Sequence, residues 1–140
     1  MKSFESNILH LGAKIVTPPM IVFAFYVFLH GHYGPGGGFQ AGAILAAAYM
    51  LNRMCLRSDQ SFTIPLRLLL LGAALGTLIY FTIGALSMPS SFLDYSIPFG
   101  SGKHRALGSL LIELGVTLTV PSALCLIFEL LTRAAMDTSS

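Results

Sequence analysis

Two long stretches without any charged side chain limit what this chain of 140 residues can fold into. No Asp, Glu, Lys or Arg occurs from Ile15 to Asn52, a run of 38 residues, or from Leu68 to Leu93, a run of 26. Charged residues make up 10% of the chain and hydrophobic residues 54%, whereas soluble globular chains carry about 25% charged residues. This balance excludes disorder, a nucleic-acid-binding domain and a disulfide-stapled secreted module. It indicates an integral membrane protein.

The apolar segments predict an all-α integral membrane protein with four transmembrane helices in one domain over residues 1–140. A spanning helix needs about 20 apolar residues. The helices are expected at about 8–29, 39–56, 66–86 and 106–131, with a glycine-rich turn between the first two. The first apolar segment is short, so Lys14 is expected to snorkel toward the membrane surface. The Pro18-Pro19 pair is expected to kink or restart this helix. We expect no cleavable signal peptide, so the first helix serves as the insertion signal.

The basic residues predict the orientation of these helices. Four spans place both termini on one side of the membrane. That side, together with the loop between the second and third helices, carries six basic residues, Lys2, Lys14, Arg53, Arg57, Arg67 and Arg133. The other side carries Lys103 and Arg105. Because Lys and Arg accumulate in cytoplasmic loops, we expect a multi-pass protein with both termini in the cytoplasm.

The most unusual stretch runs from His30 to Gly42 and reads His-Gly-His-Tyr-Gly-Pro-Gly-Gly-Gly-Phe-Gln-Ala-Gly. Consecutive glycines before a helix can form an anion-binding nest of backbone N–H groups. No Lys-Ser/Thr pair follows them, so the pattern is not a phosphate-binding P-loop. We favour a steric interpretation, in which Gly36, Gly37, Gly38 and Gly42 form a packing turn close to a neighbouring helix or subunit.

The same stretch contains two histidines, His30 and His32. Their spacing at a helix end does not place both rings on one face, and interfacial histidines in contact with water are the simpler interpretation. Participation in proton exchange is the alternative, because histidine titrates near neutral pH. No cysteine spacing typical of a metal site occurs, and no nucleophile–base constellation is evident. We therefore expect no enzyme activity, no cofactor, no metal site and no nucleic-acid partner.

Glu113 is the strongest candidate for chemistry. Counted from Ala106 at about 1.5 Å per residue, it lies about 10 Å into the last helix. A carboxylate at membrane depth costs several kcal/mol unless it faces a partner, water or the protein interior. Ser109 and Thr117 flank it at i−4 and i+4 and extend a polar stripe. Two interpretations stay open, a place in an ion or proton path and an interhelical hydrogen bond.

Other features concern packing. Gly72-x-x-x-Gly76 in the third helix repeats a small-residue spacing also found in the second, and such spacing lets membrane helices approach closely. Glu129 lies four residues before Arg133, which indicates an interfacial ion pair along one helix. Four helices so poor in internal polar groups are better suited to a subunit of something larger than to a transporter acting alone.

The segment His30-Gly-His-x-x-Pro-Gly-Gly-Gly-Phe-Gln-Ala-Gly42 resembles the MnhB/MrpB family, whose members are small subunits of Mrp-type multisubunit Na+/H+ antiporters. A second segment in the last helix, Ser109-Leu-Leu-Ile-Glu-Leu-Gly-Val116, is similar to the family as well. The resemblance covers roughly residues 8–131. The basic cluster Lys103-His104-Arg105 departs from the family pattern.

The resemblance implies a small subunit of a bacterial or archaeal cytoplasmic (inner) membrane complex that exchanges Na+ for H+. Its implied partners are other subunits of the antiporter, including the large antiporter-like subunits that it would scaffold, and membrane lipid. Glu113 matches the family's acidic position in the last helix, and residues 36–38 match the glycine turn. Two alternatives remain, the equivalent subunit of a membrane-bound hydrogenase or another complex I-like redox-driven pump, and a purely structural subunit.

Overall fold

The computed structural model describes residues 2–31, 37–55, 63–86 and 104–138. Within these ranges the chain forms four helices, α1 (Lys2–His30), α2 (Gly38–Cys55), α3 (Leu66–Leu86) and α4 (His104–Asp137). No strand occurs in these ranges, and the all-α prediction is confirmed. Helix α1 begins well before the expected residue 8, because the polar residues ahead of its apolar part contain neither Gly nor Pro.

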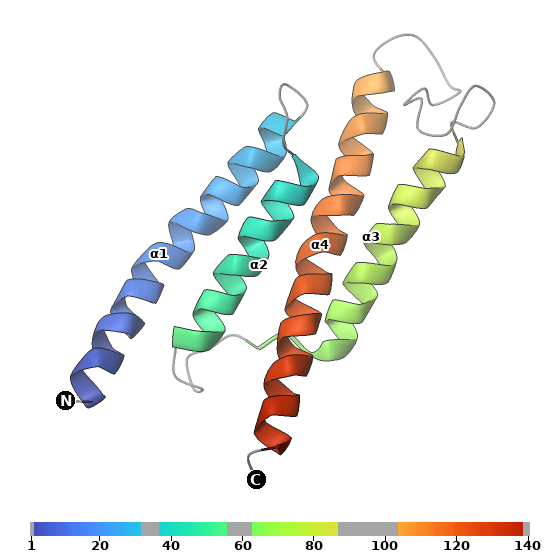
Figure 1. Cartoon of the computed structure of the whole chain (residues 1–140). Helices are drawn as coiled ribbons and strands as arrows, with labels where there is room; N and C mark the ends of the chain where they lie inside the picture. The colour runs from blue at the N-terminus through green and yellow to red at the C-terminus, as the bar shows by residue number, and fades with distance from the viewer. Residues whose placement is uncertain (1, 32–36, 56–62, 87–103, 139–140) are drawn as a thin grey trace.

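The four helices stand side by side in the order α1, α2, α4, α3 (Figure 1). Helix α1 packs on α2, α2 on α4, and α4 on α3. The last helix in the sequence therefore lies between the second and the third. Because successive helices alternate in direction, α2 and α4 run the same way, and the start of α1 and the end of α4 lie on the same side (Figure 1).

Three of these helices are long and apolar enough to cross a membrane, over Asn7–His30, Leu66–Leu86 and Gly108–Ala135. Helix α2 has 18 residues and contains Gln40, Asn52 and Arg53, which lower its hydropathy. Its length is about 27 Å, close to the hydrocarbon thickness of about 30 Å. The position of α2 between two long helices supports the prediction that it crosses as well.

Small residues form the contacts between the helices. The buried residues of α2 are all glycine or alanine, Gly38, Ala41, Gly42, Ala46 and Ala48. Helix α1 contributes the buried Ala13 and Ala24. The large apolar side chains instead point outward; Val22, for example, is 69% exposed and Leu78 64%. In a membrane this arrangement holds helices together by close backbone approach, while lipid or other proteins cover the apolar exterior.

Candidate functional site

The carboxylate of Glu113 on α4 lies against the turn that joins α1 to α2. A Cβ atom placed on Gly31 would lie 2.7 Å from Glu113 Oε2. A Cβ atom on Gly37 would lie 3.0 Å from the same oxygen and 3.0 Å from Cδ. Side chains at these two positions would therefore occupy the space that the carboxylate fills. The glycines form a turn, as the sequence suggests, and they also make room for an acidic group.

The same turn presents the beginning of a helix to this carboxylate. Gly37 has a φ of +101°, a conformation that L-residues rarely adopt. Its carbonyl accepts a hydrogen bond of 3.0 Å from the Ala41 N–H, which closes the first turn of α2. The N-terminus of a helix carries a partial positive charge. Glu113 therefore lies where the dipole of α2 stabilises a carboxylate.

Thr117 fixes the backbone of α4 at this point. Its Oγ1 donates a 2.7 Å hydrogen bond to the Glu113 carbonyl oxygen. A Cβ atom on Gly38 would clash with that carbonyl oxygen and lie 3.0 Å from Thr117 Oγ1. The predicted polar stripe thus exists, but the Thr117 hydroxyl bonds to the backbone of α4. Ser109, the third member of the stripe, is half-buried one turn earlier.

Gly42 continues the contact between α2 and α4. A Cβ atom on it would lie 2.8 Å from Pro121 Cδ and 3.0 Å from Val120 Cβ. Gly38 and Gly42 therefore serve as packing positions against α4. The predicted residues Gly36 and His32 lie outside the described residues.

His30 is the last residue of α1, and it is exposed. Its ring stacks on that of Tyr26, with 4.2 Å between the ring centroids. Its Nδ1 lies 3.1 Å from the Tyr26 carbonyl oxygen, within hydrogen-bonding distance. These contacts orient the ring along its own helix, and proton exchange at His30 remains a prediction.

A second acidic contact joins α2 to α4 near the other end of α2. Arg53 donates from Nε to Glu129 Oε1 over 2.7 Å and from Nη2 to Oε2 over 3.3 Å. The Tyr49 hydroxyl donates to the same Oε1 over 2.7 Å. It also accepts a 3.3 Å hydrogen bond from the Ile64 N–H, just ahead of α3. This network ties three segments of the chain together.

The interpretation of Glu129 as an interfacial partner of Arg133 is wrong. Glu129 is 2% exposed, and its ion pair is with Arg53. Arg133 is exposed. The i,i+4 rule considers a single helix, whereas Glu129 points toward a neighbouring one. The sequence held one signal for this contact, since Arg53 and Glu129 are both assigned to the cytoplasmic ends of their helices.

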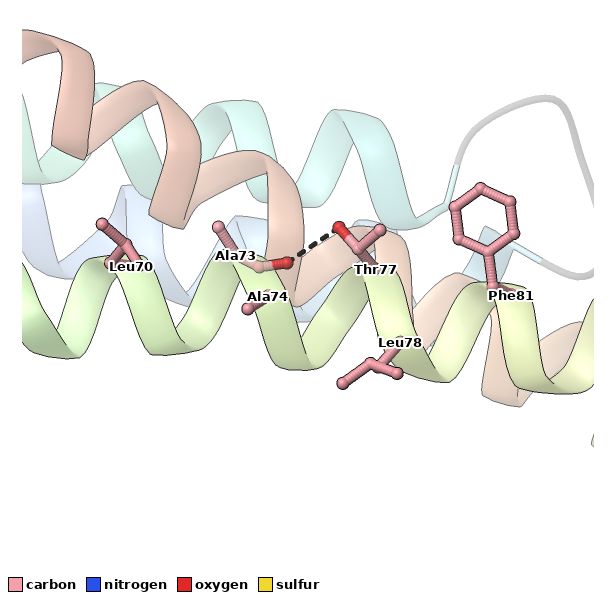
Figure 2. A pocket seen from close by; sticks show the side chains of 6 residues that line it. All are labelled: Leu70, Ala73, Ala74, Thr77, Leu78 and Phe81. Atoms are coloured by element: carbon pink, nitrogen blue, oxygen red, sulfur yellow. Dashed lines mark hydrogen bonds between the residues drawn. The ribbon is translucent and has the colours of Figure 1, made fainter.

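Figure 2 shows a hollow on the outer side of α3, lined by Leu70, Ala73, Ala74, Thr77, Leu78 and Phe81. The Thr77 hydroxyl donates a 2.8 Å hydrogen bond to the Ala73 carbonyl oxygen, so it is satisfied within its own helix. The hollow therefore presents apolar surface. In the described part of the chain, no group of three or more His, Cys, Asp or Glu residues could hold a metal ion. The glycine turn with Glu113 is the candidate functional site.

A single layer of long apolar helices, joined through small residues and two buried or half-buried carboxylates, defines an integral membrane protein. Residues 8–126 match the family described as "Domain related to MnhB subunit of Na+/H+ antiporter". The chain belongs to this MnhB family, which confirms the resemblance drawn from its sequence.

Curated relatives bear antiporter names. The chain is 29% identical over 122 residues to the "Putative antiporter subunit mnhB2" of Staphylococcus haemolyticus, covering 81% of this chain and 84% of the relative. It is 29% identical over 119 residues to an Na+/H+ antiporter subunit of Bacillus subtilis, covering 81% and 83%. A shorter match, 42% identical over 53 residues, covers 36% of this chain and 37% of the Na+/H+ antiporter subunit of the same type from Alkalihalophilus pseudofirmus. These relatives are named as parts of a transporter.

Proposed function

We propose that this chain scaffolds the large subunits of an Na+/H+ antiporter and lends Glu113 to an intramembrane path for ions or protons. Membership of the MnhB family and the named relatives support a subunit of a multisubunit Na+/H+ antiporter. Such a subunit has the other subunits of the complex as its partners. The cytoplasmic membrane of a bacterium or archaeon is its proposed location.

The observation that carries the role of Glu113 is the position of its carboxylate in the glycine turn at the start of α2. A carboxylate at membrane depth is a functional candidate by default. The two acidic residues within the spanning part of α4 differ in their surroundings. Glu129 is 2% exposed and bound by Arg53 and Tyr49. Glu113 is half-buried, so a neighbouring subunit or water can reach it more easily.

The single-layer fold supports a role inside a complex. A row of helices has two broad faces and encloses no path within itself (Figure 1). A path that includes Glu113 therefore needs a neighbouring subunit to complete its walls. Both acidic groups lie at contacts with α2, so α4 holds the candidate residue in place while other surfaces remain available to partners.

We further propose that both termini face the cytoplasm. The start of α1, the end of α2 and the end of α4 lie on one side (Figure 1). The basic residues at that side are Arg53 in the last turn of α2, Arg67 in the first turn of α3 and Arg133 near the end of α4. An excess of positive charge is typical of the cytoplasmic side.

The test of Glu113 is Na+/H+ exchange by the whole complex in inverted membrane vesicles. We expect Glu113→Gln to lower exchange by on the order of tenfold or more, with the complex assembled in normal amounts. Glu113→Asp should retain part of the activity, because it keeps the charge. Ser109→Ala, one turn earlier on the same helix, is the matched control. Full exchange by an assembled Glu113→Gln complex would remove the path role and leave the scaffold.

The test of the scaffold is a pull-down of the tagged chain in mild detergent, followed by mass spectrometry. Large antiporter-like subunits in the eluate would support the proposal. Redox subunits in their place would assign the same fold to an electron-driven pump. Loss of assembly in Glu113→Gln, in proportion to the loss of exchange, would indicate a purely structural role for this residue.

A further inference from the structure

We propose that the outer face of α1 around Lys14, Pro18 and Pro19 is a docking surface for a membrane helix of another subunit. The helix that fits it carries a carboxylate and, beside it, a hydrogen-bond donor. This inference rests on the proposed place of the chain in a multisubunit complex, and it is independent of any role of Glu113.

The proline pair leaves polar backbone atoms on this face. Helix α1 continues through both Pro18 and Pro19. Proline has no N–H, so the carbonyl oxygens of Lys14 and Ile15 lose the amide donors that would normally reach them from four residues ahead. The hydroxyl of Thr17 donates to the Ala13 carbonyl oxygen over 2.7 Å, which is a different acceptor. Two backbone acceptors therefore need donors from elsewhere.

This part of α1 points away from the rest of the chain. Lys14, Ile15, Pro18 and Pro19 are all exposed, whereas the adjacent Ala13 is buried. Helix α1 packs on α2, and the exposed face is turned away from that contact. A membrane offers no water to such carbonyls, so a neighbouring helix has to satisfy them.

Two places in the same chain show how polar groups within spanning helices are otherwise handled. Pro121 in α4 is half-buried and lies against α2, where a Cβ atom on Gly42 would come within 2.8 Å of its Cδ. Thr77 on the exposed side of α3 donates to a carbonyl of its own helix (Figure 2). The proline pair of α1 has neither solution within the described chain.

The depth of Lys14 strengthens the case for a protein partner over lipid. Lys14 lies 16 residues before His30, or about 24 Å along the helix, while the hydrocarbon layer is about 30 Å thick. With His30 at one boundary, the backbone at Lys14 lies inside the layer. The ammonium group can snorkel to the lipid headgroups, but the carbonyl oxygens cannot.

The charge of Lys14 then specifies the partner. An ammonium group at this depth is stabilised by a carboxylate on the facing helix, and the two carbonyls by a hydroxyl or amide donor. Leu11 and Val22, on the same side of α1, are 59% and 69% exposed and supply the apolar part of the contact.

Site-specific photo-crosslinking in native membranes tests this surface. A benzoylphenylalanine probe replaces Val22 on the proposed face or, as the matched control, Leu78 in the apolar hollow of α3. We expect the Val22 probe to form a covalent adduct with another subunit, within a membrane segment that contains Asp or Glu. Lys14→Met should lower the yield of this adduct by about tenfold or more, while Lys14→Arg keeps it. The adducts of the Leu78 probe should not change.

Several results would overturn the proposal. These are adducts of the Val22 probe with lipid alone, an unchanged yield in Lys14→Met, and an adduct segment without a carboxylate. The probe in the unaltered Lys14 background gives the answer even if Lys14→Met fails to assemble. An adduct with a redox subunit would overturn the antiporter assignment and leave the docking surface standing. Lipid adducts in a correctly assembled antiporter would do the reverse.

Discussion

Arg53 and Glu129 join α2 to α4 through an ion pair with 2.7 Å between Nε and Oε1. At the other end of α2, the carboxylate of Glu113 lies against Gly31 and Gly37. Helix α4 therefore contacts α2 through an acidic residue at each end, with the two residues about 24 Å apart along α4. One carboxylate meets a guanidinium group, and the other meets the positive end of a helix dipole.

Removing one partner of the buried pair should cost more than removing both. Arg53→Met leaves the Glu129 carboxylate buried without its cation, which in other proteins costs about 3–5 kcal/mol. The double variant Arg53→Met/Glu129→Met should recover most of this loss. Thermal stability in detergent, followed by size-exclusion chromatography, measures both variants. Arg133→Met, at an exposed position, is the control with little effect. A double variant less stable than Arg53→Met alone would contradict this account of the pair.

Gly37→Ala should destabilise the chain and disturb the position of Glu113. Alanine at a φ of +101° is strained, at a cost of roughly 1–2 kcal/mol, and its Cβ would crowd the Glu113 carboxylate. Gly12→Ala is the matched control, because nothing lies within 4 Å of a Cβ atom there. It should be neutral or stabilise α1 by up to about 1 kcal/mol. Equal stability of the two variants in a thermal assay would argue against a steric role for Gly37.

Gly72 and Gly76 on α3 should respond differently to alanine. A Cβ atom on Gly72 would meet the side-chain oxygen of Ser122, whereas one on Gly76 would meet the backbone of α4, including the Gly115 carbonyl oxygen. We expect Ser122→Ala to relieve the defect of Gly72→Ala. The defect of Gly76→Ala should be larger and unaffected by Ser122→Ala, because the helices themselves must separate.

Thermal stability of the single and double variants gives the energies of this comparison. Non-additivity should be confined to the Gly72/Ser122 pair, whose groups are in direct contact. Additive effects for that pair would show that Ser122 does not limit the approach of α3 to α4.

The two cysteines offer a test of orientation. Cys55 is half-buried at the end of α2, whereas Cys125 is 3% exposed. With both termini in the cytoplasm, a membrane-impermeant maleimide should label Cys55 in inside-out vesicles and leave it unlabelled in right-side-out vesicles. Cys55→Ser should abolish labelling, because Cys125 stays covered. Labelling with the opposite sidedness would place the termini outside.

The sequence predicts the elements of this fold better than their neighbours. Long apolar runs reveal the helices, and the glycine spacing at Gly72 and Gly76 identifies close contacts correctly. The order of the helices cannot be inferred in the same way, because helices that are apolar on all sides carry little information about which face meets which. The placement of α4 between α2 and α3 therefore needed the structure.

The candidate site shows the same division. Its two components, Glu113 and the glycine-rich segment, are visible in the sequence as separate features 76 residues apart, counted from Gly37. Their contact depends on tertiary packing between α4 and the α1–α2 turn. Local rules also misassigned Glu129, because a helix-surface pair with Arg133 is the nearest partner in sequence but not in space.

The small residues between the helices reverse the usual pattern of mutational tolerance. In a soluble domain, trimming a large buried side chain is the damaging change. Here the buried apolar residues are mostly alanines, and many large ones, such as Phe25 at 58% and Leu131 at 66%, are exposed. Enlarging an alanine or glycine between helices should therefore do the most harm to folding, whereas trimming a large outer residue should spare the fold and reveal which parts of the exterior a neighbouring subunit occupies.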